Sequence, residues 1–590
     1  GSEMCIRDRF KNFTKKDWSL IIICLAFIIL QVWLDLKLPD YMSKITMLVQ
    51  TTGSTMDEII ESGVKMLGCA LGSLASSVVV AIFAARVATN FAANLRERLF
   101  DKVQAFSMEE IGSFSTASLI TRSTNDISQI QTLVVMGLQA IIKAPIMAVW
   151  AIFKIAGKSW QWTASTGVAV IVLLVIVGSC MIFALPKFKK LQQLTDDLNR
   201  VTRENLTGIS VVRAYNAENY QENKFENANQ ELTSANLFAN RVMAIMSPGI
   251  QGIMSGLTLA IYWIGAILIE NAAMMDKLNL FSDMVVFSTY AMQVVMAFMM
   301  LVMIFIMFPR ASVSSKRIME VLETVPIIND GTVTVAKPGI KGQIEFKNVS
   351  FKYPDAEDYV LQNITFTVAQ GETVAFIGST GCGKSTVINL VPRFYDVTEG
   401  EVLVDGINVK AYTQYALHNK IGYVSQKAVL FSGTIESNVA YGDNGRNNNL
   451  QNDVIDAIYT AQASDFVEAS PRRYNSYVAQ GGSNYSGGQK QRISIARAIC
   501  RQPEIMIFDD SFSALDYKTD QKLREALKKD CCDATKLIVA QRIGTIRDAD
   551  KIIVLDEGVI VGMGTHEDLM KNCQVYQQIA RSQLSKEELE

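Results

Sequence analysis

Long apolar stretches occupy the first half of the chain, and they constrain the fold more than any other feature. A helix needs about 20 mostly apolar residues to cross a bilayer. Six stretches reach that length, and they lie near 18–38, 63–88, 131–156, 160–186, 243–270 and 281–308. The sequence therefore predicts an all-α membrane domain of six long transmembrane helices, followed by an ordinary soluble domain.

Basic residues before the first stretch predict the orientation of the membrane domain. They are Arg7, Arg9, Lys11, Lys15 and Lys16. Such a basic lead belongs on the cytoplasmic side, so six spans return the soluble half to the cytoplasm. Phe10, Phe13 and Trp18 interleave with these charges, which fits an interfacial helix or, alternatively, a disordered basic tail.

The connections between the spans differ in length and composition. The two cytoplasmic connections, about 89–130 and 187–242, are long and polar, and the second has almost no glycine or proline. This composition favours membrane helices that continue into the cytoplasm, where their tips could press on the soluble domain.

Two features inside the spans are candidates for contact with a transported molecule. Lys143 lies in the third span, where a charge is costly and is a functional candidate by default, although it could also snorkel or pair with a partner chain. The sixth span carries methionines at helical spacing on one face, which suits either an adaptable substrate cavity or ordinary helix packing. They are Met292, Met296, Met299, Met303 and Met307.

Composition excludes several classes of function. The formal net charge of −2 over 590 residues gives no general preference for nucleic acid. The nine cysteines show no metal-ligand spacing beyond the adjacent pair Cys531-Cys532, so we expect free thiols. We expect a tag remnant (Gly1-Ser2) with a basic segment over 1–16, a transmembrane domain over 17–322, a linker over 323–341 and a nucleotide-binding domain over 342–590.

A phosphate-binding loop begins at Gly378. The run Gly378-Ser379-Thr380-Gly381-Cys382-Gly383-Lys384-Ser385-Thr386 fits G-x-x-x-x-G-K-[ST]. An expected strand, 373–377, precedes it and a helix-like stretch, 386–391, follows, which is the context that the motif requires. The glycines let backbone N–H groups approach phosphate, Lys384 neutralises β/γ charge, and Ser385 can ligate Mg²⁺. The motif predicts ATP and Mg²⁺ binding in an α/β P-loop domain.

Further motifs follow in order along the soluble half. Tyr353 lies at an expected strand edge, where it could stack on adenine, and Gln426 follows an expected strand over 421–425. The run Tyr485-Ser486-Gly487-Gly488-Gln489 opens a helix, whose free backbone donors can face phosphate. The apolar run 505–508 ends at Asp509, a buried-strand position that can deliver a carboxylate to Mg²⁺, and Ser513-Ala514-Leu515-Asp516 follows shortly after.

Together these motifs resemble the ATP-binding cassette (ABC) transporters of the exporter type, over nearly the whole chain. The resemblance implies that Tyr353 stacks on adenine, that 378–386 is the Walker A loop and that Gln426 is the Q-loop glutamine and a Mg²⁺ neighbour with Ser385 and Asp509. It also implies that Ser486, Gly487, Gly488 and Gln489 form the signature motif and that Ser513, Ala514, Leu515 and Asp516 form the D-loop. The segment from Glu204 to Ala214 resembles the second intracellular loop, with a coupling helix expected near Ala214 to Asn219.

The chain departs from the family pattern at the expected reaction centre. Efficient family members carry Glu after the Walker B Asp and His at the later switch position, whereas this chain has Asp510 and Gln541. Upstream of the signature, Ala479-Gln480-Gly481-Gly482 replaces the usual Glu-Arg pair, and Tyr485 replaces the usual Leu. These departures predict a site that binds ATP and hydrolyses it poorly.

The resemblance further implies a dimer in which each ATP lies between the Walker motifs of one domain and the signature of the other. We therefore expect the degenerate-site subunit of a heterodimeric multidrug-type exporter, whose non-identical partner carries Glu and His. Its substrates would be amphipathic small molecules, peptides or lipids, and it would reside in a bacterial inner (plasma) membrane. The alternatives are a homodimeric slow ATPase exporter, an exporter-fold importer of siderophore type and an ATP-gated channel or regulator.

Overall fold

The chain folds into two compact units. The computed structural model describes residues 15–51, 54–156, 159–273, 276–335, 339–354, 356–442 and 450–583. One unit comprises residues 1–104 and 116–324, and the other comprises 105–115 and 325–590. The interfacial segment expected at Phe10 and Phe13 lies outside the described residues, whereas Trp18 belongs to the first long helix.

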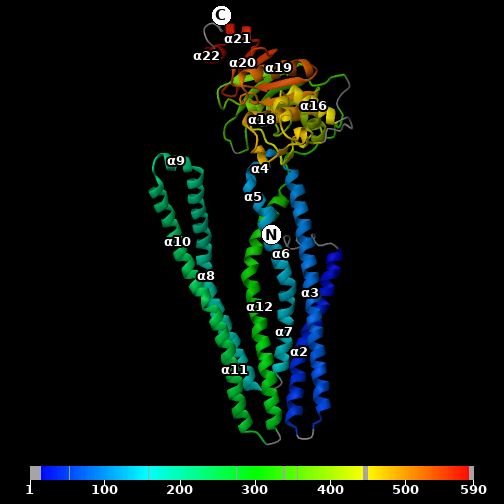
Figure 1. The fold of residues 1–590 in the computed structure, drawn as a ribbon, viewed down its shortest axis with the longest axis vertical. Helices are drawn as coiled ribbons and strands as arrows, with labels where there is room; N and C mark the ends of the chain where they lie inside the picture. The colour runs from blue at the N-terminus through cyan, green and yellow to red at the C-terminus, as the bar shows by residue number, and fades with distance from the viewer. Residues whose placement is uncertain are drawn as a thin grey trace. The chain divides into compact units, whose positions relative to one another are not determined.

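The regular elements described in the first unit are all helices, which turns connect (Figure 1). Its described residues include six helical segments that are long and apolar enough to cross a membrane, as predicted. The elements are α2 (Lys15–Gln50), α3 (Met56–Gln104), α5 (Thr116–Thr121), η1 (Arg122–Asp126), α6 (Ile127–Met136), η2 (Gly137–Ile141), α7 (Ile142–Ala156), α8 (Trp160–Thr207), α9 (Ile209–Ala214), α10 (Glu218–Ala244), α11 (Met246–Glu270) and α12 (Lys277–Glu323).

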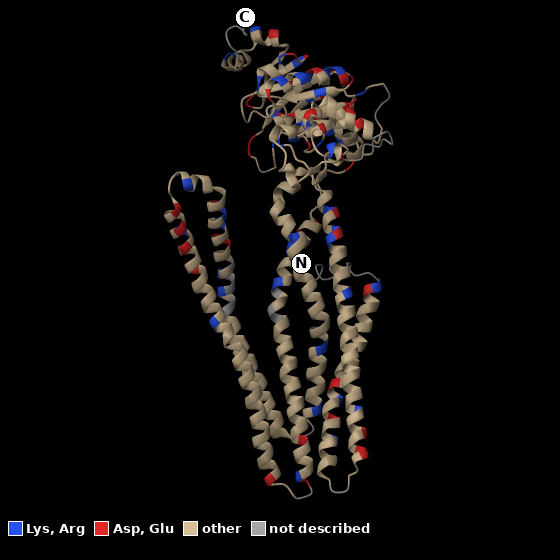
Figure 2. Ribbon diagram, viewed as in Figure 1, with Lys and Arg blue, Asp and Glu red and all other residues tan. Residues whose placement is uncertain are grey.

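Several helices run well past their apolar segments. Helix α8 has 48 residues, which is about 70 Å at 1.5 Å per residue and more than twice the hydrocarbon thickness of a bilayer. It packs against α10, and the charged side chains of this pair gather on the end that α9 closes (Figure 2). The predicted continuation of the membrane helices is therefore confirmed.

The tip of this hairpin corrects one expectation. The tip helix is α9, whereas residues 214–219 were expected to be helical. Gly208 ends α8 with a non-helical ψ of 14°, and Asn216 takes a φ of +50° in the turn before α10. Asparagine tolerates that left-handed conformation, so the chain reverses there and a helix cannot cross the position.

The third span is not a regular α-helix. Two π-helical segments, η1 and η2, interrupt it. Pro145 lies four residues after Ile141, the last residue of η2, and it has no N–H to donate to the Ile141 carbonyl. The local widening of the helix at η2 thus coincides with a hydrogen bond that Pro145 cannot make.

The second unit contains three sheets. The main sheet has the order β12-β11-β3-β10-β9-β6, in which β12 runs antiparallel to β11 and the other neighbours are parallel. An antiparallel sheet has the order β2-β1-β4-β5, and β7 pairs with β8. The strands are β1 (Ile344–Phe351), β2 (Leu361–Val368), β3 (Thr373–Gly378), β4 (Glu399–Val404), β5 (Ile407–Asn408), β6 (Ile421–Val424), β7 (Gly433–Thr434), β8 (Tyr477–Val478), β9 (Ile505–Asp509), β10 (Thr535–Val539), β11 (Lys551–Asp556) and β12 (Val559–Gly564).

Helices cover the main sheet, and an apolar core lies on each of its faces. The helical segments described in this unit are α4 (Met108–Phe114), α13 (Lys384–Leu390), η3 (Val409–Ala411), α14 (Gln414–Asn419), α15 (Ile435–Val439), α16 (Leu450–Thr460), α17 (Ser464–Glu468), η4 (Arg473–Asn475), η5 (Gln480–Gly482), α18 (Gly487–Cys500), α19 (Tyr517–Asp530), α20 (Ile543–Ile546), α21 (His566–Asn572) and α22 (Gln574–Gln583), and only some of them lie on the main sheet. All five residues of β9 are buried, as expected for a central parallel strand. The carboxyl ends of β3, β6, β9 and β10 consequently meet at one edge, where ligands bind in open α/β sheets.

Candidate nucleotide-binding site

The loop between β3 and α13 has the shape of a phosphate cradle. Gly383 has a φ of +97° and directly precedes the first residue of α13. A Cβ at Gly383 would come within 2.6 Å of Leu361 Cδ2, so both the conformation and the space require glycine. The backbone can thus approach an anion at the N-terminal end of α13.

Lys384 lies inside this loop and donates to it. Its ammonium donates to the carbonyl oxygens of Gly378 at 2.9 Å and Ser379 at 2.6 Å. The side chain is only 9% exposed, and these carbonyls satisfy two of its three donors. The ammonium is therefore placed where an incoming phosphate could compete for it.

Ser385 and Asp509 come together at the end of β9. The Ser385 hydroxyl donates to Asp509 Oδ1 over 2.7 Å. Burial raises the pKa of the Asp509 carboxyl, with a smaller contribution from neighbouring Asp510 and opposing contributions from Ser385 and Lys384. The Ser385 hydroxyl and the Asp509 carboxylate thus place two oxygen atoms side by side, and oxygen atoms are the ligands that suit Mg²⁺.

Asp510 follows β9 in an unusual backbone conformation. Its φ is +46°, and its N–H donates to the Val539 carbonyl over 3.0 Å. Its carboxylate oxygen Oδ2 accepts from the Gln541 amide at 2.9 Å and from the Gln426 amide at 3.4 Å. Burial raises the pKa of this carboxyl, although the hydrogen bond from Gln426 lowers it in part. Gln426 and Gln541 lie 84 and 31 positions from Asp510 in the sequence, and both donate to the same Asp510 oxygen.

Tyr353 lies beside the phosphate loop in an aromatic group. Its hydroxyl lies 3.1 Å from the hydroxyl of Thr386, and its ring makes edge contacts with Tyr395 and Phe351 at 5.3 and 4.9 Å between centroids. These contacts fix the ring close to the start of α13. The predicted adenine-stacking residue and the predicted phosphate loop therefore belong to one site.

The signature segment forms a helix cap. Ser486 caps α18, where its hydroxyl accepts from Gln489 N at 3.3 Å and its N–H donates to Gln489 Oε1 at 3.0 Å. Tyr485 donates from its hydroxyl to the Tyr477 carbonyl over 3.3 Å and keeps its ring against the core. The D-loop residue Asp516 likewise caps α19 by accepting from Thr519 N at 3.0 Å.

Helix α4, which lies within the cytoplasmic connection expected at 89–130, belongs to the second unit, and Glu110 in it was not among the predicted site residues. In α4, Glu110 accepts from Ser107 N at 2.7 Å and from the backbone N–H of Ile327 at 2.8 Å. Burial acts to raise the pKa of the Glu110 carboxyl. The hydrogen bonds from Ser107 and Ile327 together outweigh burial, so the pKa is lowered. The pattern Ser107-x-x-Glu110 is a capping box and was the signal available in the sequence.

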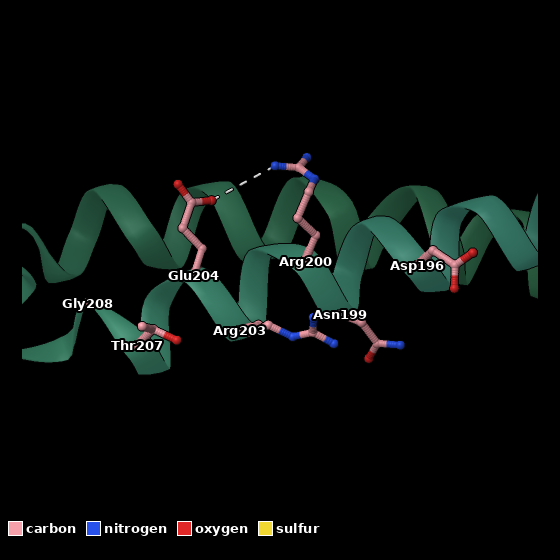
Figure 3. A pocket seen from close by; sticks show the side chains of 7 residues that line it. All are labelled: Asp196, Asn199, Arg200, Arg203, Glu204, Thr207 and Gly208. Atoms are coloured by element: carbon pink, nitrogen blue, oxygen red, sulfur yellow. Dashed lines mark ion pairs between the residues drawn. The ribbon is translucent and has the colours of Figure 1, made fainter. Parts of the chain in front are cut away.

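A surface hollow of about 760 Å³ lies along the polar part of α8 and does not have the features of a ligand site. Figure 3 shows Arg200 directed toward Glu204, and Arg200 also bonds to Asp197. The hollow is open, and Glu204 in its lining already pairs with Arg200 on α8 and with Lys224 on α10, so the hollow adds no second candidate.

The structure also shows the surroundings of the cysteines, of Lys143 and of the methionines in the sixth span. The eight described cysteines are free, as predicted. In the first unit Lys143 pairs with Asp35 over 3.2 Å, a partner that its sequence neighbourhood does not indicate. Met296 and Met303 on α12 are 39% and 54% exposed, whereas Met292, Met299 and Met307 are partly buried, so the methionine face is only partly packed within the chain.

The fold and the site define a membrane transporter half, in which six membrane helices precede one domain with a P-loop. The family models agree. Residues 21–322 match the ABC transporter transmembrane region, and residues 361–513 match the ABC transporter domain. The chain belongs to the ABC transporter family and is an exporter half-transporter with a nucleotide-binding domain that implies ATP binding.

Named relatives and a solved structure agree with this assignment. An uncharacterized ABC transporter ATP-binding protein of Mycobacterium tuberculosis is 38% identical over 530 residues, which is 89% of both chains. An ATP-dependent lipid A-core flippase of Syntrophus aciditrophicus is 30% identical and covers 86% of this chain and 83% of its own. A bacterial Atm1-family ABC exporter solved with ATP bound aligns with a TM-score of 0.78 at 25% identity, over 96% of this chain and 99% of that one.

Proposed function

We propose that this chain is the degenerate-site subunit of a heterodimeric ABC exporter that moves amphipathic small molecules, peptides or lipids out of the cytoplasm. Its own Walker motifs would bind ATP and hydrolyse it slowly. Its signature motif, Ser486 to Gln489, would complete the competent site of a partner that carries Glu and His at the matching positions.

The observation that carries this proposal is the hydrogen bond from Gln541 to Asp510. Asp is one methylene shorter than the Glu of efficient family members, so its carboxylate is withdrawn by about one bond length. An error near 1 Å at a reaction centre can cost about a hundredfold in rate. Gln541 cannot exchange protons, and its amide occupies the Asp510 oxygen over 2.9 Å.

The residues that hold nucleotide remain suited to binding. Lys384 and the loop N–H groups would hold the phosphates, Tyr353 would stack on the base, and Ser385, Asp509 and the nearby Gln426 would hold Mg²⁺. The cation would neutralise charge on the β- and γ-phosphates. Lys384 would exchange its bonds with Gly378 O and Ser379 O for phosphate oxygens, and Asp510 would hold the attacking water weakly because Gln541 shares its carboxylate.

ATP binding would act through closure of two nucleotide-binding domains. Helix α4 of the second unit is tied to the segment after α12 by the bond from Ile327 N to Glu110. Helix α9 at the tip of α8 and α10 would contact the partner. Movement of the domains would thereby reach the membrane helices and turn the cavity outward, and hydrolysis at the partner's competent site would reset it.

The test compares ATP hydrolysis by this chain alone with hydrolysis by a co-purified pair that includes a neighbouring half-transporter. We expect the pair to be faster by at least tenfold, and Asp510→Ala to lower the pair's rate by less than about twofold. Equal rates with and without the partner would exclude the heterodimer. A large loss in the Asp510→Ala pair would make this carboxylate the working base.

A further inference from the structure

Four helices of the first unit bring polar side chains together inside the spans. Lys143 on α7 donates to Asp35 Oδ2 on α2 over 3.2 Å, and Ser73 on α3 donates to Asp35 Oδ1. The Gln293 amide on α12 lies 3.5 Å from the Asp35 backbone carbonyl. The side chains of Lys143 and Asp35 are 19% and 23% exposed. We call Asp35, Lys143 and Gln293 the intramembrane cluster.

The cluster lies far from the ends of the candidate membrane spans that contain Asp35 and Lys143, which are Lys16–Gln50 and Thr116–Ala156. Asp35 is 20 residues after the first residue of α2, or about 30 Å along the axis, and Lys143 is 13 residues before the end of α7, or about 20 Å. Lys143 also lies two residues after Ile141, the last residue of the π-helical segment η2, and such irregularities are frequent at functional sites. Ionisable groups at such depth are costly and are retained where they act.

The cluster has unused hydrogen-bonding capacity of both kinds. Among the described residues, the Lys143 ammonium has Asp35 as its one acceptor, although it carries three donors. The Gln293 Oε1 atom is buried and has no donor within the described part of the chain. Spare donors and a spare acceptor therefore lie next to the same residue, since Lys143 contacts the Asp35 carboxylate and the Gln293 amide contacts the Asp35 backbone carbonyl. Buried polar groups in native proteins are nearly always paired, so these atoms indicate a missing partner.

A second ion pair between the same two helices provides a contrast. Asp40 on α2 accepts from Lys154 on α7 over 2.8 Å and from the Tyr290 hydroxyl over 2.7 Å. Lys37 lies 3.9 Å from the same carboxylate. Both Asp40 oxygens are occupied, as both Asp35 oxygens are, but among the described residues no side-chain atom of Asp40, Lys154 or Tyr290 is buried without a partner, in contrast to Gln293 Oε1. The pair of Asp40 and Lys154 serves as a matched control for the intramembrane cluster.

An adaptable apolar surface adjoins the cluster. Met296 lies three residues after Gln293 on α12 and is 39% exposed, and Met303 lies two turns farther on and is 54% exposed. Side chains at i and i+3 are neighbours on a helix. Thioether side chains fit many apolar shapes. A ligand with a polar head at Gln293 would thus place its apolar body along the methionine face.

We propose that the intramembrane cluster binds a zwitterionic headgroup, with its phosphate or carboxylate on Lys143 and its N–H-bearing ammonium on Asp35 and Gln293 Oε1. One positive and one negative side chain complement a ligand with both charges, whereas an anion alone would meet Asp35 and a cation alone would meet Lys143. The N–H groups supply the donor that Gln293 lacks. This assignment rests on the proposed export of amphiphiles and names their headgroup class.

The test measures binding of four single-chain amphiphiles to the purified full chain in phosphatidylglycerol nanodiscs, by intrinsic tryptophan fluorescence. Lysophosphatidylethanolamine carries both charges and N–H donors, and lysophosphatidylcholine carries both charges without N–H. Lysophosphatidic acid lacks the cation, and dodecylammonium lacks the anion. We expect lysophosphatidylethanolamine to bind at least tenfold tighter than the other three amphiphiles.

Three variants assign the preference to the cluster. The double change Asp35→Asn with Lys143→Met removes both charges together and so leaves no unpaired ion, and it should abolish the preference. Gln293→Leu should reduce the discrimination between the ethanolamine and choline headgroups at least fivefold. The control Asp40→Asn with Lys154→Met should retain the headgroup preference and the discrimination between ethanolamine and choline. Equal binding of the four amphiphiles by the wild type, or loss of the preference in the control, overturns the proposal.

Transport is measured separately in proteoliposomes of the assembled exporter. If the headgroup preference is observed but no amphiphile moves on addition of ATP, the binding site at the intramembrane cluster is supported and the proposed export is contradicted. If ATP-driven movement of amphiphiles is observed while the four headgroups bind equally, the proposed export is supported and the binding site at the intramembrane cluster is contradicted.

Discussion

The Gln541 side-chain amide donates a hydrogen bond to Asp510 Oδ2 over 2.9 Å, and Gln426 approaches the same oxygen at 3.4 Å. Two amide donors thereby orient the carboxylate that directly follows β9. An amide donates to such a carboxylate but takes no proton from it, so Gln541 fixes Asp510 without assisting proton transfer.

The first prediction concerns this pair of residues. Asp510→Glu together with Gln541→His should raise ATP hydrolysis by the purified chain about a hundredfold, because the longer carboxylate reaches the water and the imidazole can exchange a proton. Each single change should give less than about tenfold, since the other defect remains. Steady-state phosphate release measures the rates. Full recovery by Asp510→Glu alone would show that Gln541 has no part in the defect.

The second prediction separates ATP binding from hydrolysis. Lys384→Met should weaken ATP binding roughly 10- to 100-fold, because it removes charge-assisted hydrogen bonds to phosphate worth about 1.5–3 kcal/mol. A fluorescent ATP analogue titrated into the purified chain measures this affinity. Lys528→Met on α19 is the control, because Lys528 is exposed and distant in sequence from the motifs. An unchanged affinity in Lys384→Met would remove the loop from the binding site.

The sequence was sufficient to predict most of the fold. The six spans follow from apolar length, and the continuation of α8 and α10 follows from a polar segment almost free of glycine and proline. The strand before the phosphate loop, expected at 373–377, is β3, and the strand that delivers Asp509 is β9. These elements are determined locally, by composition and by one motif at a time.

Other features depend on contacts that a single sequence does not reveal. The π-helical segments η1 and η2 depend on packing in the third span, and Pro145 alone does not specify how the helix adapts. Asp35 and Lys143 are 108 positions apart, so their pairing follows from the packing of α2 against α7. The hydrogen bond between Gln541 and Asp510 likewise requires β9 and β10 to be neighbours, which only the sheet order shows.

The third prediction concerns the attachment of α4. Glu110→Ala should leave the backbone N–H groups of Ser107 and Ile327 without their acceptor, at a cost of about 1–3 kcal/mol for each one that stays buried. Amide hydrogen exchange of residues 105–115 should become faster. Glu110→Gln keeps an acceptor and should show a smaller increase. Equal exchange in the wild type and Glu110→Ala would mean that this contact does not hold α4.

The fourth prediction concerns pH and His566. Burial, together with the nearby Arg547 charge, lowers the His566 pKa below its usual 6.5, and its Nδ1 lies 2.7 Å from the Tyr576 hydroxyl. Burial raises the Tyr576 pKa to about 12, so that hydroxyl stays protonated and donates. Between the folded pKa and 6.5 the unfolded state binds more protons, so stability is lost as the pH falls through this window.

Hydrogen exchange of residues 565–583 at pH 7.5 and 5.5, corrected for intrinsic rates, measures this effect. The wild type should lose protection at the lower pH, and His566→Asn, which keeps an acceptor near Tyr576, should lose less. The chain has only one other histidine, His418, and His418→Asn is the matched control. The same loss of protection in His566→Asn and the wild type would contradict the prediction.

The tip formed by α9 and the start of α10 has a consequence for how the cell supplies this protein. Val211, Tyr215 and Tyr220 are 61%, 79% and 68% exposed there. A newly made copy that finds no companion would present these side chains to chaperones and proteases, which act on exposed apolar surface. In the proposed heterodimer, the amount of this chain in the membrane would then follow the synthesis of the partner chain.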